Sequence, residues 1–531
     1  MQIIAENISF TLPQGKQILH NISLSVSNGE KSALAGDNGT GKSTLIRILA
    51  GVLSPQTGSV YRNGKTWFVP QHYGQFNNLT VSQILKIHLK TEALKAIEQG
   101  SADPQDFETL ADDWNIHERL HTALEHWELP DIHANTPFHS LSSGQKTKLF
   151  LAGTGLHNPD MVLMDEPTNH LDRAGREKLY RLIRETSSGL FIVSHDRELL
   201  ELCNPIYELS PAGVQTYGGN YSFYKAQKQI EMEALDQKIE HTKKEISTAR
   251  KKHLDAMQRK QKMDARSAKK GKKANLPPIV KNARGSKAEN SASRLNEVHT
   301  NKIKAEKAHL KQLTQLKRES KQANLSVSNS SLHTGKILFE AKQLNIGWPD
   351  SRYLWETPRS FVIKSGERIR ISGRNGSGKS TLLHTLTQQL KPACGELSVH
   401  ADSVFLLDQE YQLINRKRSV LEQANKFNEN QKPDHELKTL LVRFLFEPSV
   451  WDQPCQKLSG GEMMRLSLCC LTLQSNQPDV IILDEPTNNL DLSNIQILTE
   501  TIAGYQGTLL VVSHDDWFIN EIGISRELSL S

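Results

Sequence analysis

The sequence lacks the features that would place the chain in a membrane, outside the cell or around a structural metal. No apolar run approaches the roughly 20 residues that cross a bilayer, which excludes a channel or permease by itself. The five cysteines are scattered without a Cys-x-x-Cys pair, so we expect idle thiols in a reducing cytoplasm and neither zinc nor redox chemistry. The opening residues, MQIIAENISF, have the pattern of a strand and not of a signal peptide, so secretion is not expected.

Acidic residues are absent from one stretch of the chain, residues 265–288, and aromatic residues are absent between Tyr224 and Phe339. Residues 225–325 hold 27 lysines and arginines against 11 aspartates and glutamates, a net charge of +16, whereas the rest of the chain carries −10. This asymmetry predicts a polyanionic partner for the basic segment. Without aromatic rings a base-stacking platform is disfavoured, and backbone contact with folded RNA fits better. The candidate RNA-binding residues are Lys269, Lys270, Lys272, Lys273, Lys281, Arg284 and Lys287, with Arg266 beside them.

The chain contains an internal duplication. GDNGTGKST at 36–44 recurs as GRNGSGKST at 373–381, and VLMDEPTNHLD at 162–172 recurs as IILDEPTNNLD at 481–491. A chain of 531 residues is too long for one core. We therefore predict two copies of one domain, at 1–221 and 335–531, with about 20 extra residues in an acidic, helical stretch of the first copy around 77–139.

A basic spacer at 222–334 separates the copies. Two stretches rich in Lys, Glu, Gln and Ala, from Ser222 to about Lys262 and from about Ser291 to Ala323, flank a segment broken by Gly and Pro. This pattern predicts an antiparallel helical hairpin. Within each copy, short β-branched runs alternate with helical patterns, which predicts an α/β fold with a mostly parallel sheet.

Both copies carry a phosphate-binding loop, G-x-x-x-x-G-K-S. Its glycines let backbone N–H groups surround a phosphate, its lysine reaches the β- and γ-phosphates, and its serine hydroxyl binds Mg²⁺. The loop residues are Gly36, Asp37, Asn38, Gly39, Thr40, Gly41, Lys42, Ser43 and Thr44 in the first copy, and Gly373, Arg374, Asn375, Gly376, Ser377, Gly378, Lys379, Ser380 and Thr381 in the second.

Acidic and histidine side chains follow the buried strands of each copy. Glu166 and Glu485 are candidate catalytic bases that act on the attacking water, and His195 and His514 are suited to contact the γ-phosphate. The candidate Mg²⁺ ligands are Ser43, Gln71 and Asp165 in the first copy and Ser380, Gln409 and Asp484 in the second.

A second anion-binding element, LSSGQ or LSGGE, places a serine and glycines at the start of a helix. Within one domain it has no phosphate left to bind, so we expect each copy to offer it to the nucleotide of the other. Its residues are Ser142, Ser143, Gly144 and Gln145, and Ser459, Gly460, Gly461 and Glu462.

The ordered set of motifs resembles that of ATP-binding cassette (ABC) ATPases, and EPTNHLD/EPTNNLD with SHD around a basic spacer resembles the ABC-F class. The resemblance implies a head-to-tail pair of cassettes with two ATP and Mg²⁺ sites, each completed by the signature of the other copy, and Asp172 and Asp491 facing across the interface. It also implies stacking of adenine on an aromatic residue upstream of each phosphate loop, for which Phe10 and Trp348 are the candidates; the residues alone leave open that both belong to the apolar core. Further, it implies a cytoplasmic monomer whose hairpin enters the tRNA exit site of the ribosome, contacts rRNA and tRNA and approaches the peptidyl-transferase centre.

Two departures and three alternatives accompany this resemblance; one alternative, a scaffold without ATPase activity, is disfavoured by Glu166 and Glu485. Ser143 stands where the family has a glycine, which predicts slower turnover at the site it completes, and Asp516 stands where an arginine is frequent. A DNA-binding ATPase of repair or chromosome maintenance would also use a basic hairpin, and a transporter ATPase subunit would also have two cassettes. Within the ABC-F class the residues leave open a housekeeping translation factor or an antibiotic-resistance protein.

Overall fold

The computed structural model describes residues 2–13, 15–273, 300–301, 303–311, 313–314, 333–347, 353–475 and 477–530. The chain divides into two compact units, one made of Met1–Tyr224 with Ala323–Ser531 and one made of Lys225–Gln322. The first unit contains the duplicated domains, which we call the first cassette (residues 2–220) and the second cassette (residues 337–530). Among the described residues, no helix combines the length and the apolar character needed to cross a bilayer.

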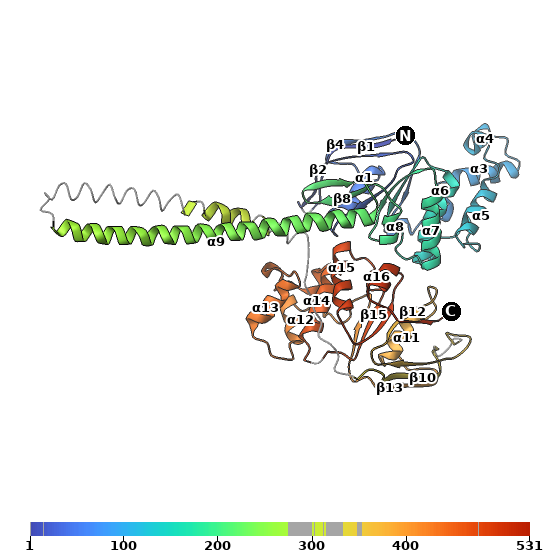
Figure 1. The fold of residues 1–531 in the computed structure, drawn as a ribbon. Helices are drawn as coiled ribbons and strands as arrows, with labels where there is room; N and C mark the ends of the chain where they lie inside the picture. The colour runs from blue at the N-terminus through green and yellow to red at the C-terminus, as the bar shows by residue number, and fades with distance from the viewer. Residues whose placement is uncertain are drawn as a thin grey trace. The chain divides into compact units, whose positions relative to one another are not determined.

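The first cassette is built on two sheets (Figure 1). The smaller one is antiparallel, in the order β2 (Gln17–Ser27), β1 (Gln2–Thr11), β4 (Thr57–Arg62). The larger one has the order β5 (Thr66–Val69), β6 (Met161–Asp165), β7 (Gly189–Val193), β3 (Lys31–Ala35), β8 (Ile206–Ser210), β9 (Gly213–Tyr217). Its strands are parallel except for the β8–β9 pair.

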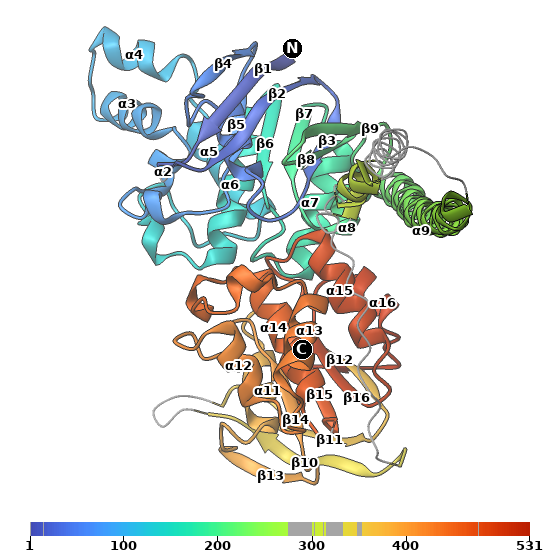
Figure 2. The same cartoon turned by 90° about the vertical axis from the view of Figure 1, so that its left-hand side faces the viewer.

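The second cassette repeats this plan (Figure 2). Its antiparallel sheet has the order β11 (Arg359–Lys364), β10 (Ile337–Asn345), β13 (Cys394–Val399). Its parallel sheet has the order β14 (Val404–Leu407), β15 (Val480–Asp484), β16 (Thr508–Val512), β12 (Arg368–Ser372), β17 (Arg526–Ser529). The predicted α/β fold class with mostly parallel sheets is confirmed.

The central strands of both parallel sheets are buried throughout. Every residue of β6, β7, β15 and β16 is buried, as expected for aliphatic strands covered on both faces. Each cassette therefore has one apolar cluster on either side of its parallel sheet. Parallel strands place all their carboxyl ends at one edge, where ligands bind in such folds.

The helices between the fifth strand and the signature differ between the cassettes. The first cassette has α2 (Val81–Ile84), α3 (His88–Glu98), α4 (Pro104–Leu110) and α5 (Ile116–His126). The second has α12 (Val420–Lys426) and α13 (Asp434–Arg443) over its described residues. The extra length expected in the first copy thus holds additional helical segments.

In the unit made of Lys225–Gln322, one long helix dominates the described residues. This helix, α9 (Tyr221–Lys273), continues beyond the predicted end at about Lys262 and includes Gly271, because a glycine inside a helix costs only about 1 kcal/mol. Residues 300–301, 303–311 and 313–314 are also helical and lie alongside α9 (Figures 1 and 2). Ile239, Ile246 and Leu313 are buried here. The predicted residues Lys281, Arg284 and Lys287 lie outside the described residues; Lys269, Lys270, Lys272 and Lys273 are described only as backbone of α9.

Two candidate nucleotide sites

Each phosphate loop joins the central strand to the first helix of its cassette. The loop after β3 leads into α1 (Lys42–Leu49), and the loop after β12 leads into α11 (Lys379–Leu386). Gly36 has φ 143°, and a Cβ atom there would collide with the backbone of Leu209, so only glycine lets the loop leave the sheet at this point. The exposed N–H groups at the start of each helix make the loop a ready site for a phosphate.

The two loop lysines are held over their loops in the same way. The Lys42 ammonium donates hydrogen bonds to the carbonyl oxygens of Gly36 and Asp37, at 2.7 and 2.9 Å. Lys379 makes the corresponding bonds to Gly373 at 2.8 Å and Arg374 at 3.1 Å. Both cations thus lie where a phosphate bound to the loop would meet them.

The two candidate bases share an uncommon backbone conformation. Glu166 follows the last residue of β6 with φ 51°, and Glu485 follows the last residue of β15 with φ 47°. The N–H of Glu166 donates to the carbonyl oxygen of Val193 at 2.9 Å, and that of Glu485 to Val512 at 2.8 Å. Left-handed non-glycine residues cluster at functional sites, and here the strained turn directs both carboxylates toward the loops.

Burial controls the protonation of these groups. Burial raises the pKa of Glu166 to about 8 and that of Glu485 to about 7, with nearby lysine or arginine partly opposing it. It also lowers the pKa of His195 well below its usual value and that of His514 to about 3. The imidazoles are therefore neutral, and their Nε2 atoms lie 3.4 and 3.3 Å from Glu166 Oε1 and Glu485 Oε1. A neutral imidazole can accept or donate a proton beside a carboxylate.

The residues at both sites fit ATP and a divalent cation. Several buried polar atoms have no hydrogen-bond partner among the described residues: Glu166 Oε1, both ring nitrogens of His195, Asp484 Oδ1, both carboxylate oxygens of Glu485 and His514 Nε2. Such atoms are costly unless a ligand or water satisfies them. Within the described part of the chain, no group of three or more His, Cys, Asp or Glu could hold a metal. A cation here would therefore depend on hydroxyl and amide oxygens and on phosphate oxygens of the nucleotide.

The candidate cation ligands gather beside each loop. The Ser43 hydroxyl donates to Asp165 Oδ1 at 3.2 Å, and burial raises the pKa of Asp165 to about 6 although this bond opposes the shift. Burial likewise raises the pKa of Asp484, beside the Ser380 hydroxyl. When bound, a magnesium ion would neutralise phosphate charge during phosphoryl transfer.

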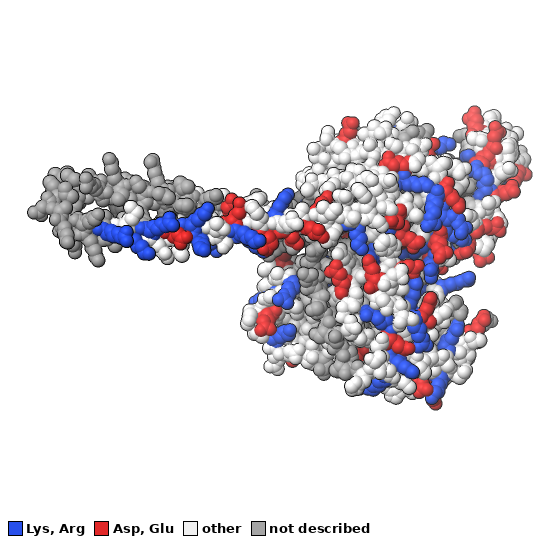
Figure 3. Space-filling model, in the orientation of Figure 1, with Lys and Arg blue, Asp and Glu red and all other residues white. Residues whose placement is uncertain are grey.

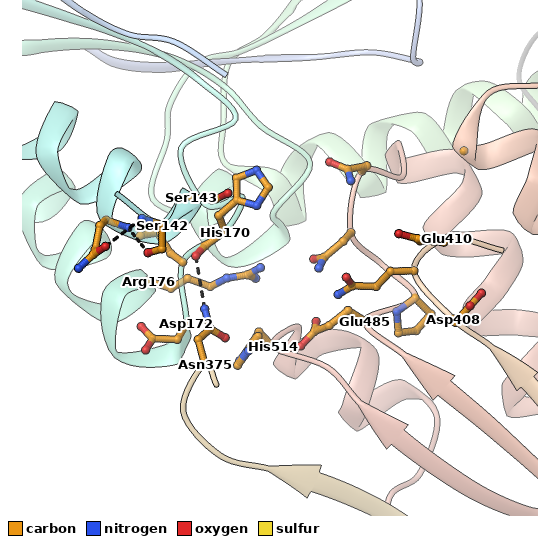
Figure 4. Close-up of a pocket in the computed structure, with 18 of the residues that line it drawn as sticks. Ser142, Ser143, His170, Asp172, Arg176, Asn375, Asp408, Glu410, Glu485 and His514 are labelled. Atoms are coloured by element: carbon orange, nitrogen blue, oxygen red, sulfur yellow. Dashed lines mark hydrogen bonds and ion pairs between the residues drawn. The ribbon is translucent and has the colours of Figure 1, made fainter. Parts of the chain in front are cut away.

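Two cavities are lined by part of the predicted site residues; Asp165, Lys379, Ser380 and Asp484 are not among the lining residues. A cavity of about 400 Å³, which we call the first site, is lined by the first phosphate loop with Gln71, Glu166, His195 and Asn489. A cavity of about 1140 Å³, the second site, is lined by the first signature Ser142–Gln145 together with Asn375, Gln409, Glu485 and His514 (Figure 4). The second site thus combines residues of both cassettes in the way the resemblance implies. Of the second signature, Gly460 lines this larger cavity.

Hydrogen bonds cross between the cassettes at both loops, but unequally. At the first loop, the Asn38 N–H donates to Asp491 Oδ2 at 2.9 Å, the Asn38 side chain donates to the Asn489 carbonyl at 3.0 Å, and the Ser493 hydroxyl donates to Asp37 Oδ1 at 2.7 Å. At the second loop, the Asn375 side chain donates to the His170 carbonyl at 3.4 Å.

Both signature serines begin a helix. Ser142 caps α6 (Ser143–His157) and Ser459 caps α14 (Gly460–Leu473), each in a reciprocal arrangement with the residue three positions later. Ser459 N–H donates to Glu462 Oε2 at 2.8 Å and Ser142 N–H to Gln145 Oε1 at 2.9 Å. These capping boxes orient the N-terminal N–H groups of both helices.

Only one of the two predicted adenine-stacking residues lies in the described part of the chain. Phe10 is half-buried against the core of the first cassette, while Leu12 and Ile18 line the first site. Trp348 lies outside the described residues. Sequence reasoning missed Asn489, Ser493 and Arg176 at the interface. Asn489 is the variable residue of the second EPTN-x-LD motif, and Ser493 and Arg176 follow the motifs closely, so their nearness to Asp491 and Asp172 is a signal that could have found them.

Comparison with known proteins agrees with this geometry. The profile of the ABC transporter family matches residues 19–169 and 357–488. The ATP-binding protein YdiF of Bacillus subtilis (strain 168) is 33% identical over 97% of this chain and 78% of its own length. ABC transporter F family member 2 of Arabidopsis thaliana is 30% identical, with coverage of 97% and 75%. The tylosin resistance ATP-binding protein TlrC of Streptomyces fradiae is 29% identical, with coverage of 94% and 92%.

Solved structures show the same fold. The archaeal ribosome recycling factor aABCE1, crystallised with the archaeal ribosomal stalk protein aP1, superposes with a TM-score of 0.59 at 19% identity, over 98% of this chain and 87% of that one. Tandem cassettes with two nucleotide sites define an ABC ATPase, an enzyme that binds ATP and hydrolyses it. The chain belongs to the ABC transporter family, in its ABC-F class. The resemblance and the ATPase activity predicted from the sequence are confirmed.

Proposed function

We propose that this ABC-F ATPase acts on the ribosome in the cytoplasm, where the spacer at 222–334 reaches the tRNA exit site and the peptidyl-transferase region and thereby modulates translation or displaces an antibiotic. The observation that carries this proposal is the net charge of +16 on residues 225–325 against −10 on the remainder. Lysine and arginine side chains gather along the described part of α9 (Figure 3). Lys251, Lys252, Arg259, Lys262 and Arg266 are all exposed there.

The names of a relative and of a structural neighbour also support an action on the ribosome. One is a tylosin resistance protein and one structural neighbour is a ribosome recycling factor. A row of exposed cations without aromatic side chains suits the phosphates of a folded RNA. ATP binding and hydrolysis would then control when the spacer is engaged.

We assign the chemistry to the residues at the two cavities. Glu166 and Glu485 act as bases on the attacking water, and His195 and His514 contact the terminal phosphate. Ser43, Gln71 and Asp165, and Ser380, Gln409 and Asp484, hold Mg²⁺. These assignments are supported by the burial, the strained backbone and the unpartnered oxygens of the two glutamates.

Co-sedimentation with ribosomes tests the partner. The double variant Glu166→Gln/Glu485→Gln should bind ATP without hydrolysing it, which traps the ATP-bound state. We expect it to pellet with 70S ribosomes when ATP is present and to remain in the supernatant without ATP. If it stays in the supernatant while ATP is demonstrably bound, the ribosome proposal is wrong; preferential binding to duplex DNA at the same salt concentration would favour a DNA-directed ATPase.

A second pair of variants tests the spacer. In the trapped background, alanine at Lys269, Lys270, Lys272 and Lys273 should weaken pelleting and reduce its salt dependence, because each phosphate contact releases counterions. The matched control replaces four exposed lysines of the cassettes, Lys16, Lys65, Lys391 and Lys417, and should pellet normally. If the two variants pellet equally, the four spacer lysines do not contribute to ribosome binding.

Cell-free translation separates the two outcomes of ribosome binding. If the protein restores translation inhibited by tylosin, it displaces the drug. If it changes the rate of uninhibited translation and leaves inhibition unaltered, it is a translation factor.

A further inference from the structure

One arginine of the first cassette reaches the nucleotide site of the second. Arg176 lies on α7 (Arg173–Glu185), one turn after Asp172, and lines the second site together with Glu485 and His514. Figure 4 shows its side chain extending from α7 into this cavity, toward those two residues. The second site therefore contains a guanidinium that comes from the opposite cassette.

The guanidinium is buried and incompletely satisfied. Arg176 Nη1 lies 3.3 Å from Asp196 Oδ2, and its side chain is 12% exposed. Its Nε atom is buried without a hydrogen-bond partner among the described residues. Burial alone would lower the pKa of Arg176, but the carboxylates of Asp196 and Glu485 raise it. It remains a full cation inside the cavity.

The first site lacks this cation among its described residues. Asp172 and Asp491 hold the same place in the two repeats, so the counterpart of Arg176 is Ile495. Ile495 is 3% exposed and belongs to the apolar core of the second cassette. Where Arg176 acts electrostatically on Glu485, the charges that act on Glu166 come from its own cassette, from Lys42, Asp165 and Asp196.

We propose that Arg176 is a phosphate-binding residue supplied in trans to the second site alone, where its guanidinium binds the terminal phosphate of ATP held by the loop at Gly373–Thr381. Guanidinium–phosphate hydrogen bonds are charge-assisted and stronger than neutral ones. The terminal phosphate distinguishes ATP from ADP, so Arg176 adds to the second site a contact that favours ATP, and among the described residues the first site has no counterpart of this contact. The two sites then differ in the residues that contact the terminal phosphate. ATP bound at the second site contacts both cassettes, because the loop belongs to the second cassette and Arg176 to the first.

An alternative role for Arg176 is purely structural. Asp196 also accepts a hydrogen bond from the Tyr180 hydroxyl at 2.8 Å and caps α8 (Arg197–Glu201), so Arg176 could serve only to neutralise this carboxylate. That role would make a substitution lower stability without distinguishing ATP from ADP. It would also not distinguish the second site from the first.

Nucleotide binding at single sites tests the proposal without using hydrolysis. Lys42→Ala weakens binding at the first site and leaves the second to be measured, whereas Lys379→Ala leaves the first. Fluorescent ATP and ADP analogues are titrated into each background, with and without Arg176→Ile, which installs the residue that the second cassette has. We expect Arg176→Ile to weaken ATP binding at the second site by about tenfold or more, to weaken ADP binding much less, and to leave the first site unchanged.

Controls make the result decisive. Arg181→Ile changes an exposed arginine on the same helix and should bind both nucleotides as the parent does. Arg176→Lys keeps a charge and should retain part of the preference for ATP. If Arg176→Ile does not fold, Arg176→Gln, which keeps hydrogen bonding and loses the charge, is measured in the same way. Unchanged ATP binding at the second site, or equal losses of ATP and ADP, would overturn the proposal.

Discussion

The backbone N–H of Asn38 donates a hydrogen bond to Asp491 Oδ2 at 2.9 Å. The other oxygen of the same carboxylate, Oδ1, accepts from the N–H of Asn494 at 2.9 Å and so caps α15 (Leu492–Ala503). One aspartate therefore fixes the start of a helix in the second cassette and holds the phosphate loop of the first. Its side chain is buried, and the contact with Asn494 is buried as well, whereas the contact with the exposed Asn38 is only partly shielded from water.

Replacing Asp491 should cost more than replacing its counterpart. Asp172 caps α7 through the Gly175 N–H at 3.0 Å, and losing a cap costs about 1 kcal/mol. Asp491→Ala loses a cap and also the hydrogen bond from the Asn38 N–H; because Asn38 is exposed, water can replace the lost acceptor, and the additional cost is about 0.5–1.5 kcal/mol. We expect a lower melting temperature for Asp491→Ala than for Asp172→Ala by calorimetry without nucleotide. Asp491→Asn, which keeps a capping oxygen, should lie between the wild type and the alanine variant.

Equal melting temperatures for the two alanine variants would mean that the Asn38 contact contributes nothing to stability.

A second prediction concerns arginine 197, which follows SHD in the first cassette. Arg197 is 4% exposed and pairs with Glu521 Oε2 at 2.6 Å and Asp515 Oδ2 at 3.4 Å, both in the second cassette. Removing one partner from a fully buried ion pair costs about 3–5 kcal/mol. Because Asp515 and Glu521 are 14% and 34% exposed and can be hydrated, we expect a smaller loss here, but one above the roughly 1 kcal/mol of an exposed pair. Arg197→Met should therefore lower the melting temperature.

Arg173→Met is the matched control. Arg173 pairs across the same interface with Asp516 Oδ2 at 3.3 Å, but it is 56% exposed, so its loss should cost at most about 1 kcal/mol. The same effect from both variants would show that burial does not decide the strength of these contacts.

Asp516 illustrates what the sequence could and could not predict. The repeated motifs predicted two cassettes, because phosphate loops and Asp-Glu strands have fixed chemistry at fixed spacing. They identified Asp516 only as a departure from the family pattern. In the structure it lies between Arg370 Nη1, at 2.8 Å, and Arg173. A contact between residues more than 300 positions apart depends on how two cassettes pack, and no local pattern carries that information.

The left-handed backbone of Glu166 and Glu485 was equally invisible in the sequence. Glutamate has no preference for positive φ, and the conformation is imposed by hydrogen bonds to the neighbouring strand. The end of α9 was missed for the opposite reason, since Gly271 is a local signal that the surrounding helix-forming lysines and alanines outweigh.

The contribution of Glu166 to the stability of the nucleotide-free protein should fall as the pH rises from about 4.5 to about 8 and level off above that. Burial raises the pKa of Glu166 from an ordinary value of 4.5 to about 8. Between these values the folded protein binds more protons than the unfolded chain, so stability decreases with pH across this window. Glu166→Gln removes this titration and should melt at a higher temperature than the wild type at pH 8.5, with the difference shrinking toward pH 5. The exposed variant Glu108→Gln should follow the wild type throughout, and a pH-independent difference for Glu166→Gln would contradict the prediction.

The signature serine at 143 offers a direct test of unequal turnover. Ser143 and Gly460 occupy the same place in the two signatures, and a Cβ atom at Gly460 would meet nothing within 4 Å. The variants Ser143→Gly and Gly460→Ser should therefore have almost the same melting temperature as the wild type. Ser143 lines the second site, where a side chain hinders close approach of backbone to phosphate. In a Glu166→Gln background, where the remaining hydrolysis comes from the second site, Ser143→Gly should raise the rate of ATP hydrolysis a few-fold.

Glu485→Gln added to that variant should reduce the rate by about 100-fold or more, which verifies the source of the activity. If Ser143→Gly leaves the rate unchanged while Glu485→Gln abolishes it, the serine does not limit the second site, and the inequality of the two sites must come from elsewhere in the interface.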